Sequence, residues 1–203
     1  MTATAFHGAL DAPGMVQTES ESELERGDRA PDFSLPDVRD DQVALADFAD
    51  ADAVLLVFTC NHCPYAKAKF DTLNDIAADY DDVAVVGVNP NDAEAYPDDS
   101  LERMRELVED GTIQYDAYLR DETGEVARAY GAVCTPDPFL LRNEDGEFTL
   151  AYHGRLDDAL NPDDEPTSEG GDARDAIDAV LAGDEPEDAF KPSRGCSIKW
   201  PDE

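Results

Sequence analysis

The chain has 203 residues, of which 49 are Asp or Glu and only 15 are Lys or Arg, so its formal net charge is −34. A field this negative repels phosphate groups, which argues against nucleic acids and anionic membranes as partners. The hydrophobic share of 41% is enough to bury a core and excludes a wholly disordered chain. Acidic residues interleaved with apolar positions are typical of a cytosolic protein adapted to multimolar salt, where the Debye length falls to about 3 Å.

The chain shows no sign of targeting to a membrane or for export. Residues 1–15, MTATAFHGALDAPGM, contain neither a basic region nor a long apolar region. No apolar run approaches the roughly 20 residues that a membrane helix needs. We therefore expect a cytoplasmic protein, and in a reducing cytosol a close cysteine pair is more often catalytic or metal-binding than structural.

Residues 1–26 are polar and irregular, which predicts a loose arm. A short extended piece is expected at 33–35, between two prolines. The continuous apolar run AVLLVFT (53–59) is typical of a strand buried on both faces. Apolar residues at helical spacing predict a helix over 64–80, and DVAVVGV (82–88) predicts a second buried strand. This order of elements implies a right-handed parallel βαβ unit.

Two shorter helices are expected next. One lies around 101–108, with Ser100 as its N-cap and Gly111 as its stop, and the other covers about 122–130 and ends at Gly131. Both have apolar residues on one face and a glycine just after the last turn.

The remaining elements complete one α/β domain. The segments PFLLR, NEDG and EFTLAYHG (138–154) predict a β-hairpin. A last amphipathic helix is expected over 172–182. We therefore expect a single domain over 27–183, followed by an irregular tail, 184–203, that packs on it.

The motif CNHC, residues 60–63, directly follows the first predicted buried strand and opens the helix after it. Sites of α/β proteins lie at this edge of the sheet, and a helix N-terminus stabilises a thiolate. Cysteines at positions i and i+3 can reach disulfide distance, so Cys60 and Cys63 are the candidate catalytic residues. His62, as an imidazolium beside a thiolate, and Lys67, on the same helix face as Cys63, are candidates for tuning the redox potential.

Three interpretations of the cysteine pair stay open. Redox chemistry needs only the two thiols and no cofactor. A soft-metal carrier would bind Cu(I) or zinc through Cys60, His62, Cys63 and Cys134, although zinc sites normally have a second such pair. The third interpretation is two inert buried thiols.

Several stretches resemble the peroxiredoxin-like (redoxin) branch of the thioredoxin superfamily. They span 27–200 and are GDRAPDFSLPD, FTCNHCPYAKA, VNPNDAEAYPDDS, YGAVCTPDPFLL, YHGRLDD and GCSIKW. The resemblance implies a thioredoxin-like fold, with a central mixed β-sheet flanked by helices. It further implies a thiol–disulfide oxidoreductase or, alternatively, an antioxidant thiol peroxidase. The partners would be protein or small-molecule disulfides, or peroxides, and a thioredoxin-type reductant.

The resemblance also assigns roles by position. Cys60 matches the first thioredoxin cysteine, which attacks the substrate disulfide, and Cys63 matches the peroxidatic cysteine. Thr135 and Pro136 match the cis-proline segment on which substrate docks. Peroxiredoxins carry Thr or Ser at the position of Cys60 and an arginine near Pro136. Because neither is present here, disulfide exchange is favoured over peroxide reduction.

Two further cysteines and one loop lie near these motifs. Cys134, two residues before the expected cis-proline, is either a third redox thiol or a small buried hydrophobic side chain. Cys196, in the tail, would resolve a disulfide or pair with Cys134. The loop at 89–96 leaves the second buried strand at the same edge of the sheet, and Asn89 and Asn91 are expected to shape it.

The charge predicts a dependence of stability on salt. Self-repulsion of −34 charges is screened at multimolar KCl and weakly screened below a few tenths molar. We expect the melting temperature to be clearly higher in multimolar KCl than in dilute buffer, as measured by circular dichroism. An equal melting temperature in the two solutions would contradict salt adaptation.

Overall fold

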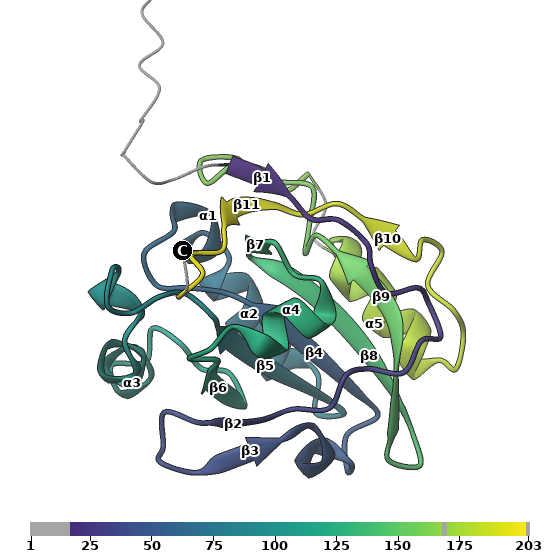
Figure 1. The fold of residues 1–203 in the computed structure, drawn as a ribbon. Coiled ribbons are helices and arrows are strands. Elements are labelled where there is room, and N and C mark those ends of the chain that lie inside the picture. The colour runs from purple at the N-terminus through teal and green to yellow at the C-terminus, as the bar shows by residue number, and fades with distance from the viewer. Residues whose placement is uncertain (1–16, 168–169, 202–203) are drawn as a thin grey trace, which may run out of the picture.

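The computed structural model describes residues 17–167 and 170–201. At its centre is a six-stranded mixed sheet with the strand order β10-β9-β8-β4-β5-β6 (Figure 1). Strands β4, β5 and β6 run parallel, whereas β8 runs antiparallel to both β4 and β9. The strands are β4 Ala53–Phe58, β5 Val83–Asn89, β6 Ala117–Arg120, β8 Asp137–Glu144, β9 Glu147–Gly154 and β10 Phe190–Lys191.

Strands β4 and β5 are the two that the sequence predicts most directly. Every residue of both strands is buried, because helices or loops cover each face of the sheet. Successive side chains point to opposite faces, so Leu55 packs in one core cluster and Leu56 in the other. The predicted strands at 53–59 and 82–88 and their parallel βαβ connection are therefore confirmed.

Strands β8 and β9 form the hairpin predicted at 138–154. Its turn contains Asp145 and Gly146, both at positive φ, which is why a glycine suits this position. Strand β6 has four residues and pairs with β5. It was not predicted from the sequence, because so short a segment lacks a clear pattern.

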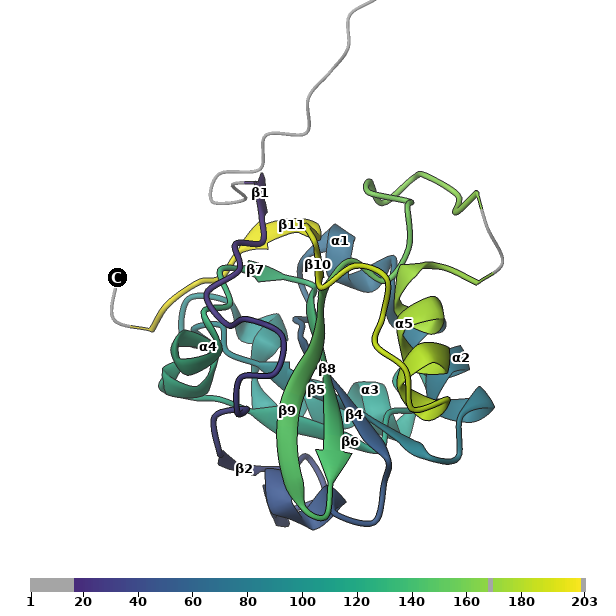
Figure 2. The same ribbon diagram turned by 90° about the vertical axis from the view of Figure 1, so that its right-hand side faces the viewer.

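Helices cover both faces of the sheet (Figure 2). Helices α1, α2, α3 and α5 pack on one face, whereas α4 and the segment that contains β2 pack on the other. The helices are α1 Pro64–Lys67, α2 Phe70–Asp79, α3 Leu101–Glu109, α4 Glu125–Tyr130 and α5 Asp172–Leu181, and two 3₁₀ turns lie at Leu45–Phe48 and Pro97–Asp99. No helix of the described part of the chain is long and apolar enough to span a membrane.

Two predicted helix ends are confirmed and one helix prediction is wrong. The hydroxyl of Ser100 accepts a backbone N–H of the first turn of α3, and Gly131 ends α4 in the left-handed conformation. The segment 64–80 is not one helix, because the backbone of Lys69 (φ −109°, ψ 1°) separates α1 from α2. The Lys69 ammonium donates to Asp157, 2.5 Å away, which holds this break against the loop after β9.

A second, three-stranded sheet joins both ends of the chain to the domain. Its order is β1-β11-β7, with β1 Gln17–Glu19, β11 Arg194–Ser197 and β7 Cys134–Thr135, and a separate hairpin pairs β2 Ser34–Pro36 with β3 Gln42–Ala44. The expected loose arm therefore does not extend through 17–26, since β1 pairs with β11. Residues 1–16 lie outside the described residues. The tail, expected to be irregular, contributes a strand.

Gly195 allows β11 to lie against β7. A Cβ atom at this position would lie 2.1 Å from the carbonyl oxygen of Thr135, too close for any side chain. We expect Gly195→Ala to lower the free energy of unfolding by about 1–3 kcal/mol in urea titrations, as other overpacked sites do.

Gly170→Ala is the matched control. Gly170 is exposed, and the nearest atom to its Cβ would be the side-chain carboxylate of Asp175 at 3.3 Å. Its free energy of unfolding should change by no more than about 0.5 kcal/mol. Equal losses in the two variants would show that the close approach of β11 to β7 does not constrain the fold.

Candidate active site

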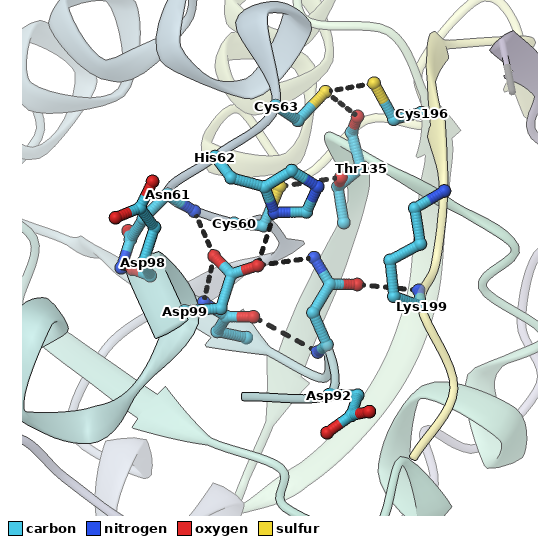
Figure 3. A network of polar contacts seen from close by, with 12 residues as sticks. Cys60, Asn61, His62, Cys63, Asp92, Asp98, Asp99, Thr135, Cys196 and Lys199 are labelled. Atoms are coloured by element: carbon cyan, nitrogen blue, oxygen red, sulfur yellow. Dashed lines mark hydrogen bonds and ion pairs between the residues drawn. The ribbon is translucent and has the colours of Figure 1, made fainter. Parts of the chain in front are cut away.

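The CNHC motif lies where the sequence predicts it, directly after β4, and Cys63 is the N-cap residue of α1. Figure 3 shows both cysteines facing Thr135 of β7 and Cys196 of β11. Cys60 and Cys63 are both 0% exposed, and Cys196 is 2% exposed. The thiols of Cys60, Cys63 and Cys196 therefore lie close together in a buried site that the tail covers.

The sulfur contacts distinguish the two cysteines of the motif. The Cys63 Sγ lies 2.6 Å from the Cys196 Sγ and 3.6 Å from the carbonyl oxygen of Thr135. The Cys60 Sγ instead lies 3.1 Å from the Thr135 hydroxyl. The peptide bond between Thr135 and Pro136 is cis, as the resemblance implies.

The three thiols also differ in charge. Hydrogen bonds from Cys196 and Cys60, together with backbone N–H groups, outweigh burial and lower the pKa of Cys63 to about 3. Burial, and then the neighbouring Cys63, raise the pKa of Cys60 well above its usual value. The hydrogen bond to Cys63, and then burial, raise the pKa of Cys196. At neutral pH Cys63 is therefore the thiolate, and the other two thiols keep their protons.

This distribution bears on which cysteine attacks. The resemblance gives Cys60 the role of the attacking thiol, by analogy with thioredoxin. Burial, and then the neighbouring Cys63 and Asp99, raise the pKa of Cys60, whereas the pKa of Cys63 is lowered, so these shifts favour Cys63 as the nucleophilic thiolate. The identity of the attacking cysteine stays a prediction.

Asp99 holds the loop that carries the motif. Its carboxylate is 0% exposed. It accepts hydrogen bonds from the Asn61 backbone N–H (2.6 Å), His62 Nδ1 (2.5 Å), Asn89 Nδ2 (3.1 Å) and Asn91 Nδ2 (3.0 Å). Burial alone would raise the pKa of Asp99, but these donors lower it, so Asp99 remains charged.

The two residues expected to tune the redox potential have different surroundings. His62 is tied to Asp99, and its ring stacks on Tyr96 with 4.6 Å between the ring centroids. Lys67 is exposed, and among the described residues none accepts a hydrogen bond from its ammonium. Thiols and backbone N–H groups, rather than Lys67, stabilise the Cys63 thiolate. The tuning roles of both residues stay predictions.

Cys134 is not part of this cluster. In the β7–β11 pair, Cys196 stands opposite Thr135, whereas Cys134 stands opposite Ser197, so Cys134 points to the other side of the small sheet. Its Sγ lies 3.9 Å from the Ser193 hydroxyl, and burial raises the pKa of this thiol. Cys134 is buried, as its interpretation as a small hydrophobic side chain expects, and of the two alternatives for Cys196 this geometry favours a partner other than Cys134.

A metal-binding arrangement would use a different set of ligands from the one expected. Among the described residues, the ligand atoms of Cys60, His62 and Asp99 lie within 4.8 Å of one another, whereas Cys134 lies apart. Asp99 already accepts four hydrogen bonds, and Cys60 keeps its proton. Asp99 is thus satisfied as a hydrogen-bond acceptor, and Cys60 is a poor ligand while it keeps its proton, whereas the buried Nε2 of His62 has no hydrogen-bond partner among the described residues. Only part of this set is therefore available to a metal ion.

Sequence reasoning missed Asp99 and the polar residues around it. Asn89 and Asn91 follow a buried strand, and two amides at that edge of the sheet are a signal that could have indicated a polar partner. Asp99 carries no such signal, because acidic residues are common throughout the chain. The loop is also tied to the tail, since the Lys199 N–H donates to Asn91 Oδ1 at 2.8 Å.

Comparisons with known proteins show the family of the chain. Residues 26–149 match the AhpC/TSA family. The chain belongs to the AhpC/TSA family. A hypothetical protein from Sinorhizobium meliloti is 42% identical (TM-score 0.82; 90% of this chain and 98% of that chain covered). An uncharacterized conserved protein from Geobacillus kaustophilus is 40% identical (TM-score 0.84; 92% and 97% covered). The curated proteins contain no match.

The fold itself is thioredoxin-like. A thioredoxin domain of a thiol-disulfide oxidoreductase from Bacteroides vulgatus has a TM-score of 0.52 at 20% identity, with 65% of this chain and 91% of that chain covered. At this identity the likeness concerns the fold alone. The redoxin resemblance and the mixed sheet flanked by helices are thus confirmed, and membership of the family indicates thiol-based oxidoreductase chemistry.

The charge on Cys63 can be measured directly. Because its pKa is lowered, the ultraviolet absorbance of the thiolate should persist on acidification until the pH approaches about 3. An ordinary cysteine loses this absorbance near its pKa of about 8.5. Cys63→Ser should remove the absorbance at neutral pH, whereas Cys134→Ser, which removes a protonated thiol, should retain it. Loss of the absorbance in wild type near pH 8 would contradict the assignment.

Proposed function

We propose that the chain is a thiol–disulfide oxidoreductase in which Cys63 attacks a substrate disulfide and Cys60 and Cys63 form the redox disulfide. The observation that supports this most directly is the position of Cys63 at the N-cap of α1, with its Sγ 2.6 Å from the Cys196 Sγ, which lowers the pKa of Cys63 and raises that of Cys196. The thiolate attacks the substrate disulfide and forms a mixed disulfide. A neighbouring thiol then attacks the Cys63 sulfur of that mixed disulfide and displaces the substrate sulfur.

The two half-reactions need only the chain's own residues and a dithiol reductant. The Cys63 thiolate bonds to one sulfur of the substrate disulfide and releases the other as a thiolate. A second thiol of the protein then loses its proton, bonds to the Cys63 sulfur and releases the remaining substrate thiol. A thioredoxin-type reductant would return the protein disulfide to two thiols.

The substrate must displace part of the tail before it reaches Cys63. Cys63 is 0% exposed, and β11 carries Cys196 directly against it. Strand β11 is held by three residue pairs with β1 and two with β7. So short a ladder near a chain end opens at low cost in free energy. Extended backbone of a protein substrate would then meet Thr135 and Pro136, the docking segment implied by the resemblance.

A thiol peroxidase is the second candidate function. It is favoured by the low pKa of Cys63, which stands directly before Pro64 as the peroxidatic cysteine of the resemblance does. Peroxide would convert the thiolate to a sulfenic acid, and Cys60 would condense with it to a disulfide. Within the described part of the chain no cation contacts the Cys63 sulfur, however: Arg120 donates to the carbonyl oxygens of Asn89 and Asn91, and the Lys199 ammonium donates to the Ser197 hydroxyl.

The setting of the enzyme is also part of the proposal. The net charge of −34 supports a cytoplasmic protein of high-salt cells, with protein or small-molecule disulfides as substrates. A soft-metal carrier has less support than either redox function, because Asp99 already accepts hydrogen bonds from the Asn61 N–H and His62 Nδ1, and Cys60 keeps its proton.

Reduction of insulin disulfides with dithiothreitol as electron donor tests the proposal. In high salt, wild type should accelerate the reaction, Cys63→Ser should abolish the acceleration, and Cys134→Ser should leave it unchanged. Stopped-flow oxidation by hydrogen peroxide, followed by thiol loss, should be slow in comparison. Rapid peroxide oxidation that is lost in Cys63→Ser, together with no insulin reduction, would assign the peroxidase function instead.

A further inference from the structure

The tail places a third thiol at the proposed nucleophile. Cys196 lies on β11, and its Sγ is 2.6 Å from the Cys63 Sγ (Figure 3). A disulfide bond joins two sulfurs at about 2.05 Å, so the two atoms need to approach by only about half an ångström. The short distance between the two sulfurs depends on Gly195, because a side chain at this position would clash with the carbonyl oxygen of Thr135 and keep β11 away from it.

The register of the small sheet fixes this placement. Cys196 stands directly opposite Thr135, and opposed residues of an antiparallel pair point to the same side. The Thr135 side chain contacts Cys60, so this side faces the motif. Cys196 is therefore held at Cys63 by backbone hydrogen bonds, independently of the loop that carries Cys60.

We propose that Cys196 is the resolving thiol of this enzyme: it forms the first disulfide with Cys63, before Cys60 does. This rests on the proposed function, since it names the thiol that completes the reaction begun by Cys63. Cys60 would act second, by exchange.

Each step balances. The Cys63 thiolate bonds to one sulfur of a substrate disulfide, and the other sulfur leaves as a thiolate. The Cys196 thiol gives its proton to that leaving thiolate and bonds to the Cys63 sulfur, and the second substrate thiolate leaves. Two protein thiols are oxidised and one substrate disulfide is reduced. The Cys60 thiol, on losing its proton to Cys196, can then displace Cys196 from the Cys63 sulfur.

The order in which Cys196 and Cys60 react follows from the causes that raise the pKa of each thiol. The largest cause of the raised pKa of Cys196 is its hydrogen bond to the Cys63 thiolate. This cause disappears once Cys63 is in a mixed disulfide and has lost its charge. The nearby Lys199 ammonium also favours the Cys196 thiolate. Cys196 is therefore activated by the very step that requires a resolving thiol.

Formation of the mixed disulfide at Cys63 lowers the pKa of Cys60 much less than that of Cys196. The largest cause of its raised pKa is burial, which the mixed disulfide does not relieve. The charged carboxylate of Asp99 also stays in place and opposes a second negative charge on Cys60. Deprotonation of Cys60 thus remains unfavourable when Cys196 is already able to react.

Reaction of the reduced protein with glutathione disulfide tests this order. Samples are quenched in acid at increasing times, alkylated and mapped by mass spectrometry. In wild type and in Cys60→Ser, the Cys63–Cys196 disulfide should be the first to appear and at similar rates. In Cys196→Ser, glutathione bound to Cys63 should persist longer, on the order of tenfold or more, because the pre-positioned partner is missing.

Two further variants test the placement of Cys196, and the fold of each is checked by circular dichroism because Gly195→Ala is expected to be less stable. Gly195→Ala retains all four thiols but moves β11 away from β7, so it too should accumulate glutathionylated Cys63. Cys134→Ser removes a buried thiol on the same pair of strands and should react like wild type.

Four outcomes would contradict the inference. First appearance of a Cys60–Cys63 disulfide, or resolution in Cys196→Ser at the wild-type rate, would overturn it and leave the proposed function intact. Failure of wild type to react with glutathione disulfide would overturn both. Insulin reduction by Cys196→Ser at the wild-type rate, with normal glutathione release, would show that Cys60 alone resolves the mixed disulfide.

Discussion

The buried carboxylate of Asp99 is the interaction on which the site depends. It accepts hydrogen bonds from the loop after β4, through Asn61 and His62, from the last residue of β5, Asn89, and from the loop after β5, through Asn91. A buried carboxylate without such donors would take up a proton, and the donors without it would be left unsatisfied. One negative charge therefore fixes where the CNHC motif lies relative to the sheet. Because Asn91 also binds the tail, the same charge helps to position β11.

That charge makes the two cysteines of the motif unequal. Cys60 lies on the Asp99 side, where burial and a neighbouring anion favour a proton. Cys63 lies at the N-cap of α1, where S–H and N–H donors converge on its sulfur. The sequence motif is symmetric in its two cysteines, but its surroundings are not. The nucleophile is therefore selected by tertiary contacts, and the contact that lowers its pKa most comes from a residue 133 positions away.

The parts of this structure that sequence predicts are those with a local physical signal. Uninterrupted apolar runs identified β4 and β5, and the position of CNHC after the first run placed the site. Ser100 before an amphipathic segment identified the start of α3. The missed features are non-local: β11 forms only by pairing with β1 and β7, and neither the irregular tail nor the arm shows a strand pattern. Asp99 is one acid among 49 acidic residues, so only the hydrogen bonds that it accepts from the loops of the site distinguish it.

The acidic surface and the site are related through the kind of group that stabilises the Cys63 thiolate. An ion pair between Cys63 and an exposed cation such as Lys67 would be screened in multimolar salt, where the Debye length is about 3 Å or less. The donors that act here are thiols and backbone N–H groups in contact with a sulfur that is 0% exposed. Hydrogen bonds at this range, away from solvent ions, are not weakened by screening. With the salt adaptation that we propose for this chain, the Cys63 thiolate would therefore be stabilised without any contribution from Lys67.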